Sequence, residues 1–175
     1  MSIRLTDRGR ELHEGDIDEL ETKLKLTLPA GYRDFLLAHN VAKPEPNRYQ
    51  TGGVTTSVQR FLGVSQDANA DLAEQNLTTY SGRLPFGFLA VAEASGGNLI
   101  CIRTRDEAVF FWDHELEAAE DEGPSLENMK RLAGSFPLFL EALQPFDPKS
   151  VVLDPKQVIS VKVKPGFLEK FKKKI

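Results

Sequence analysis

The sequence predicts a single α+β domain in which an antiparallel β-meander lies between helices. Two patterns predict this fold class: helical spacing of apolar residues toward both ends of the chain, and three β-rich runs with short connections at its centre. The composition, with 41% hydrophobic and 27% charged residues, is that of a water-soluble globule. A chain of 175 residues has room for one such domain, because globular domains usually contain about 100 to 200 residues.

Two helices are predicted before the meander. Ile17, Leu20 and Leu24 share one helical face behind Asp16, whose carboxylate can accept hydrogen bonds from the first turn, so a helix is expected over about residues 16 to 25. Pro29 suits the start of a second helix, over about residues 30 to 40, because its missing N–H costs nothing there.

A long loop and a short strand are expected next. Residues 41 to 57 contain two prolines and two glycines and show no sustained period, so we expect a mobile loop. Residues 60 to 64 are β-rich and predict a short strand. Ala70, Ala73, Leu77 and Tyr80 mark one face of a third helix.

The meander is predicted from three runs, at residues 86 to 92, 98 to 103 and 108 to 113. Their connections are too short for parallel crossovers, so neighbouring strands must be antiparallel. The first connection contains Gly96 and Gly97. No helix start or Gly-Lys-Ser/Thr sequence follows these glycines, so they predict a hairpin turn rather than a phosphate site.

One helical face is predicted over about residues 125 to 143, beginning at Ser125. Pro137 interrupts it, so we expect a kink or two short helices, the second capped by Ser135. The domain is expected to span residues 1 to 144, followed by a C-terminal extension over 145 to 175. In that extension the alternation over 158 to 164 predicts a strand, and Pro165 starts a short basic helix.

Two zones of opposite charge underlie the formal net charge of −4. Residues 93 to 128 carry ten acidic and two basic side chains, whereas residues 145 to 175 carry eight lysines and three acids. Such local fields attract partners of opposite sign. The basic extension could contact nucleic acid or anionic lipid weakly, but we expect Phe167 and Phe171 to dock on the domain, packed or swapped, with the lysines in water.

Several classes of protein are not expected. The longest apolar runs have five residues, as at Phe88 to Ala92, whereas a membrane helix needs about 20. No secretory signal is recognised, and one cysteine cannot form an intramolecular disulfide, so we expect a cytoplasmic protein. One cysteine and three histidines make no spaced zinc set, and neither metal nor cofactor is predicted. The sequence leaves the oligomeric state open.

Several motifs, taken in order, resemble the SUKH superfamily, which includes the fungal Smi/Knr cell-wall regulators and many bacterial immunity proteins. The resemblance covers about residues 12 to 144. It is carried by the segments 28 to 37 (LPAGYRDFLL), 84 to 92 (LPFGFLAVA), 96 to 98 (GGN), 109 to 115 (VFFWDHE) and 135 to 140 (SFPLFL). One departure is that Asn40 is followed by Val41, where the family usually has Asn-Gly.

This resemblance implies a protein-binding domain without catalytic activity. Bacterial members of the superfamily neutralise a cognate toxin, often a nuclease, by binding it, so the chain is expected to be an immunity protein of a toxin system. The alternative within the superfamily is a regulatory scaffold of the Smi/Knr cell-wall-regulator type, which binds host proteins without any toxin.

The acidic stretch from Asp113 to Glu122 is the predicted partner-binding site. Carboxylates can occupy phosphate positions and pair with Lys and Arg in a basic toxin cleft. The alternative is an ordinary solvated loop. The predicted contact residues are Asp113, Glu115, Glu117, Glu120, Asp121 and Glu122.

Three neighbouring residues invite other interpretations. Trp112 lies in a β-rich run and is expected in the core rather than at an interface. Cys101 lies in an apolar run and is expected to be a buried thiol rather than a nucleophile. His114 beside Asp113 raises a third hypothesis, a small hydrolase, which requires the imidazole in a deep pocket with converging carboxylates or a metal.

Overall fold

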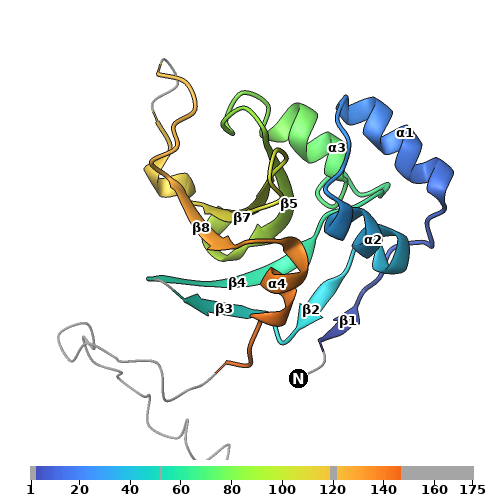
Figure 1. Cartoon of the computed structure of the whole chain (residues 1–175), viewed down its shortest axis with the longest axis horizontal. Helices are drawn as coiled ribbons and strands as arrows, with labels where there is room; N and C mark the ends of the chain where they lie inside the picture. The colour runs from blue at the N-terminus through green and yellow to red at the C-terminus, as the bar shows by residue number, and fades with distance from the viewer. Residues whose placement is uncertain (1–2, 52, 119–121, 147–175) are drawn as a thin grey trace, which may run out of the picture.

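The structure is a computed structural model that describes residues 3–51, 53–118 and 122–146, and an antiparallel sheet forms its centre (Figure 1). Helices α1 to α3 are grouped to one side of this sheet, and α4 lies near β3, β4 and β8. The elements in chain order are β1 (Arg4–Thr6), α1 (Glu14–Leu24), α2 (Ala30–His39), β2 (Lys43–Glu45), β3 (Arg48–Thr51), β4 (Val54–Phe61), α3 (Leu72–Glu74), the π-helical turn η1 (Gln75–Thr79), β5 (Phe88–Ala94), the 3-10 turn η2 (Ser95–Gly97), β6 (Leu99–Arg103), β7 (Val109–Trp112), the 3-10 turn η3 (His114–Leu116), β8 (Met129–Ala133) and α4 (Phe136–Glu141).

The sheet confirms the predicted meander and extends it. Its six strands run in the order β3-β4-β5-β6-β7-β8, each antiparallel to the next. Between β6 and β7 the register pairs Leu99 with Trp112 and Ile100 with Phe111, and all four of these side chains are buried. The glycines of η2 form the predicted hairpin turn, with φ of 77° at Gly96 and 80° at Gly97. The α+β fold class predicted from the sequence is therefore confirmed.

The predicted mobile loop over residues 41 to 57 is wrong. This segment forms β2, β3 and the first part of β4, and the strand expected at residues 60 to 64 ends instead at Phe61. Pro44 is tolerated because β2 belongs to a separate two-stranded sheet, where it pairs with Leu5 of β1. In β4 the buried residues Val54, Thr56 and Val58 alternate with more exposed ones, the pattern of a strand with one wet face.

The single helical face predicted over residues 125 to 143 is also wrong in its first half. Met129–Ala133 forms strand β8, which pairs with β7, and the Ser125 hydroxyl only accepts from the Glu127 amide (3.1 Å). The second half is confirmed: α4 begins at Phe136 after the N-cap Ser135, with a proline in its first turn. Pairing with β8 satisfies the backbone of β7, whose four side chains are all buried, and this outweighs the helical spacing.

Two of the first three helices differ from prediction at their ends. Helix α1 begins two residues earlier than expected, so Asp16 is the third residue of the helix and not its N-cap. The Asp16 carboxylate instead accepts from the amide of His13, the residue before the helix (2.8 Å). Helix α2 matches its predicted range. The third helix is short: α3 covers only Leu72–Glu74 and continues as the π-helical turn η1.

Aromatic side chains join the helices to the sheet. The Phe136 ring of α4 makes edge contacts with Tyr32 and Phe35 of α2 and with Phe61 of β4. The buried Tyr32 hydroxyl donates to the carbonyls of Leu62 (2.7 Å) and, at 3.1 Å, of Val91. The core therefore fixes α2 and α4 against the strands that lead to the meander.

The predicted strand at residues 158 to 164 and the basic helix after Pro165 lie outside the described residues. Within the described part of the chain, no helix has both the length and the apolar character needed to cross a membrane.

Candidate functional site

The acidic loop, which we define as residues 113 to 122, begins where β7 ends. The backbone of Asp113 is tied to Asn128: its amide donates to the Asn128 carbonyl (3.0 Å), and its carbonyl accepts from the Asn128 side chain at 3.3 Å. The Asp113 carboxylate caps η3 by accepting from the Glu115 amide (3.3 Å) and pairs with Lys130 (3.4 Å). These contacts hold the start of the acidic loop against β8.

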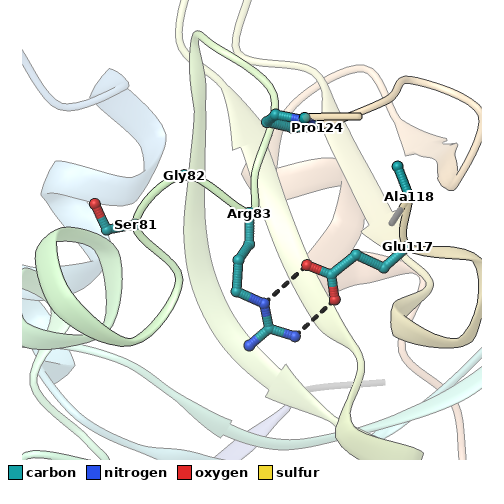
Figure 2. A pocket seen from close by; sticks show the side chains of 7 residues that line it. Ser81, Gly82, Arg83, Glu117, Ala118 and Pro124 are labelled. Atoms are coloured by element: carbon teal, nitrogen blue, oxygen red, sulfur yellow. Dashed lines mark hydrogen bonds and ion pairs between the residues drawn. The ribbon is translucent and has the colours of Figure 1, made fainter. Parts of the chain in front are cut away.

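A second contact holds the acidic loop at Glu117. The Arg83 guanidinium donates in a bidentate manner to this carboxylate, from Nε to Oε1 at 2.8 Å and from Nη2 to Oε2 at 2.7 Å (Figure 2). The same guanidinium lies over the rings of Tyr80 (5.1 Å) and Trp112 (5.3 Å). The Arg83 hydrogen bonds lower the pKa of Glu117 below its ordinary value, so the pair stays charged at neutral pH.

A cleft of about 610 Å³ adjoins this ion pair. Figure 2 shows that the segment before β5 lines one side of the cleft and the acidic loop lines the other. Its lining residues are Ser81, Gly82, Arg83, Glu117, Ala118, Gly123 and Pro124.

The six predicted contact residues fall into three groups. Asp113 and Glu117 are partly buried and engaged in the ion pairs described above. Glu115 and Glu122 are exposed, and neither forms an ion pair with another described residue. Glu120 and Asp121 lie outside the described residues. The structure thus separates carboxylates that fix the loop from carboxylates that face solvent.

His114 is held by hydrogen bonds and Cys101 by burial in the core. His114 Nδ1 lies 3.0 Å from Asn98 Oδ1, which also accepts from the His114 amide, and a side chain at Gly97 would contact the imidazole ring. Cys101 is fully buried, and burial raises the pKa of its thiol. Trp112 is fully buried, which confirms its predicted place in the core. Among the described residues, no cluster of His, Cys, Asp and Glu could hold a metal ion.

Comparison with known proteins decides the family. The sequence model of the SMI1 / KNR4 family (SUKH-1) matches residues 11–142, which is most of the chain. The chain belongs to this SUKH-1 family. It is also similar to the SPbeta prophage-derived uncharacterized protein YokK of Bacillus subtilis (strain 168), with 29% identity over an alignment covering 57% of this chain and 61% of YokK. The chain therefore spans less than two thirds of the length of that relative.

In this SUKH-1 domain the turn after α2 is built around an asparagine. Asn40, which is followed by Val41 instead of the usual glycine, adopts a positive φ of 54° itself and is almost fully buried. Its side chain donates to the carbonyls of Arg10 and Val64 and accepts from the Val64 amide. These three bonds hold a backbone conformation that favours glycine.

The sequence reasoning missed the basic partners of the acidic loop. Arg83 precedes Glu117 by 34 residues, and Lys130 lies in a segment expected to be helical, so neither pairing was visible as a local pattern. Elsewhere in the acidic zone, Arg60 pairs with Glu93 (3.1 Å). Because these ion pairs neutralise some carboxylates of residues 93 to 128, fewer unpaired negative charges remain there than the composition indicates.

Proposed function

We propose that this SUKH-1 domain is an immunity-type protein that neutralises a cognate toxin by binding it through the acidic loop. The proposal rests on family membership, because bacterial members of the superfamily neutralise toxins by binding, and on the geometry of the loop. The similarity to the prophage-derived protein YokK is compatible with this role. In this role the domain holds its partner and carries out no reaction.

One observation carries the assignment to this surface. The bidentate Arg83–Glu117 pair holds the first part of the loop, in which Glu115 is exposed, and Glu122 at the end of the loop is exposed as well. A preorganised surface loses little conformational entropy on binding, so exposed carboxylates on a fixed loop can bind Lys and Arg more tightly than carboxylates on a freely moving segment.

We assign different roles within the acidic loop. Glu115 and Glu122 contact the basic surface of the toxin, as do Glu120 and Asp121 according to the sequence-based hypothesis. Asp113 and Glu117 position the loop through Lys130 and Arg83. Loss of a contact residue should therefore reduce affinity without changing the fold, whereas loss of a positioning residue should also increase loop motion.

The test is titration calorimetry with the toxin encoded beside this gene. Replacing Glu115, Glu120 and Glu122 by Gln and Asp121 by Asn should weaken binding by at least about tenfold, because several charge pairs at the interface are lost together. Circular dichroism and the thermal midpoint should remain those of the native chain, since Glu115 and Glu122 are exposed.

A matched control is the quadruple variant E11Q/D18N/E19Q/E141Q, which removes four exposed carboxylates before and within α1 and at the end of α4. It should leave affinity unchanged, so that the effect of the loop is separated from that of net charge. Unchanged affinity in the loop variant would remove the acidic loop from the interface. If no toxin is encoded nearby, the regulatory-scaffold hypothesis is favoured instead.

A further inference from the structure

His39, the last residue of α2, is a titratable side chain that the acidic-loop proposal does not use. Its ring is partly buried and packs against the Phe35 ring, with 5.4 Å between the two centroids. The Nδ1 atom of His39 is buried and forms no hydrogen bond with another described residue. Because most buried polar atoms have hydrogen-bond partners, this nitrogen marks a place where a change of protonation has a structural cost.

A hollow of about 250 Å³ lies between the end of α2 and the segment that precedes α1. It is lined by residues 8 to 11 on one side and by residues 36 to 40, which include His39, on the other. Two hydrogen bonds join the two sides. The Gly9 amide donates to the Val41 carbonyl (2.7 Å), and the Asn40 side chain donates to the Arg10 carbonyl at 3.0 Å. Residues 8 to 11 are therefore held to the turn that directly follows His39.

The charged groups that line this hollow opposite His39 all belong to residues 8 to 11. Arg8 and Glu11 are exposed, and neither forms an ion pair with another described residue. Arg10 is paired with Asp16. The residues of α2 that line the hollow beside His39 are uncharged. The end of α2 itself favours a cation, because its last carbonyls carry partial negative charge.

Protonation of His39 is disfavoured in this arrangement. In a neutral ring with its proton on Nε2, Nδ1 carries only a lone pair, whereas the imidazolium has an N–H at both nitrogens. The added Nδ1–H would be buried without an acceptor, and the cationic ring would lie opposite the Arg8 guanidinium. Burial and, to a smaller extent, Arg8 lower the pKa of His39 below its ordinary value, so these two effects outweigh that of the helix end.

We propose that His39 is a pH-sensitive switch that controls the contact between residues 8 to 11 and the end of α2. At neutral pH the ring is neutral and the contact is closed. As the pH falls below about 6.5, where an exposed histidine takes up a proton, the open form binds that proton more readily than the closed form does. Opening lets Nδ1 donate to water, and it breaks the bonds from Gly9 to Val41 and from Asn40 to Arg10.

The test is amide hydrogen exchange of Gly9 in the full chain, measured by NMR at about pH 7.5 and about pH 5.5 and corrected for the intrinsic exchange rate. The protection of Gly9 should be several-fold lower at the lower pH. The decrease should not exceed about tenfold, the limit for one proton that binds the open form with the ordinary pKa of about 6.5. Gly9 should also exchange faster than the Leu62 amide, which donates to the Val91 carbonyl in the core, because the opening is local.

Two variants and a control assign the effect to His39. H39F keeps an aromatic ring against Phe35 but cannot titrate, so its Gly9 protection should be the same at both pH values. R8Q removes the charge opposite the imidazole, so the pKa of His39, followed by its ring proton shifts, should rise and the loss of protection should become smaller. R105Q is the control for R8Q and should behave like the native chain, because Arg105 is also exposed but does not line this hollow.

Three results would overturn the proposal. The first is a Gly9 protection that does not change with pH in the native chain, and the second is a loss of protection that persists in H39F. The third is equal protection of Gly9 and Leu62 at both pH values, which would assign the pH dependence to unfolding of the whole domain. If H39F does not fold, R8Q decides: a His39 titration and a loss of protection that both remain native in R8Q would contradict the switch.

Discussion

Asn40 shows how one side chain can replace the freedom of glycine. Its backbone has a φ of 54° and a ψ of −137°, a combination that L-residues rarely adopt. Two glycines make room for the asparagine: a Cβ on Gly63 would lie 2.2 Å from Asn40 Oδ1, and one on Gly9 would lie 2.7 Å from Nδ2. The strained conformation persists because the side chain joins α2 to two other segments.

Two replacements of Asn40 should distinguish the effect of backbone strain on stability from the effect of the lost hydrogen bonds. N40A retains the strain and leaves the Val64 amide and two carbonyls without their partner, so it should lower the free energy of unfolding by about 2 to 4 kcal/mol. N40G loses the same hydrogen bonds but adopts the positive φ freely, so it should be about 1 kcal/mol more stable than N40A. Urea denaturation measures both, and equal stability of the two variants would contradict the strain argument.

At the scale of elements, the sequence predicts the structure where local constraints suffice, and it fails where a neighbouring strand decides the structure. The short connections between β5, β6 and β7 force antiparallel pairing whatever the rest of the chain does. By contrast, Met129 to Ala133 has apolar spacing compatible with a helix, and only its position beside the buried strand β7 makes it a strand. Pro44 likewise argues against a strand at β2, because proline is tolerated only in strands at the edge of a sheet. The sequence does not show that this segment is an edge strand paired with β1.

The same division holds for the candidate site. The sequence indicates the acidic loop because six of its ten residues are carboxylates, and it places Trp112 in the core from its neighbours. It does not show that Arg83, 34 residues before Glu117, lies across from the loop and over the Trp112 ring. Contacts between elements depend on how the sheet curls and pairs, which no local window of residues specifies.

The acidic loop should become more mobile when its ion pair is removed. E117Q replaces the charged bidentate pair with a weaker neutral contact, so amide hydrogen exchange over residues 114 to 118 should become faster. Global stability should change by less than about 1 kcal/mol, because the pair is partly exposed to solvent. D106N, which breaks the exposed Arg103–Asp106 pair instead, is the control and should leave exchange in the loop unchanged.

At the scale of the whole molecule, four carboxylates in different parts of the fold pair with basic side chains, and each has a lowered pKa. The largest cause in every case is a hydrogen bond from the basic partner. The pairs are Asp7 with Lys43, Asp16 with Arg10, Asp106 with Arg103, and Glu117 with Arg83. Asp16, which also accepts from the His13 amide, has its pKa lowered to about 2.

These shifts predict that stability is lost in acid. A carboxyl whose pKa is lower in the folded state stabilises the fold at pH values above its unfolded pKa, and this stabilisation disappears as the pH falls through the folded pKa. Unfolded Asp and Glu titrate near pH 4. The free energy of unfolding, measured by urea denaturation, should therefore decrease as the pH falls from about 5 toward 2.

Asp16 should account for the most acidic part of this decrease, because its folded pKa of about 2 keeps it charged after carboxyls of ordinary pKa are protonated. D16N removes its titration, while the amide oxygen can still accept from the His13 amide and so preserves the start of α1. D16N should be less stable than the native chain at neutral pH, and the two stability curves should converge as the pH approaches 2. Curves that stay parallel through the acid range would show that the Arg10–Asp16 pair does not couple protonation to folding.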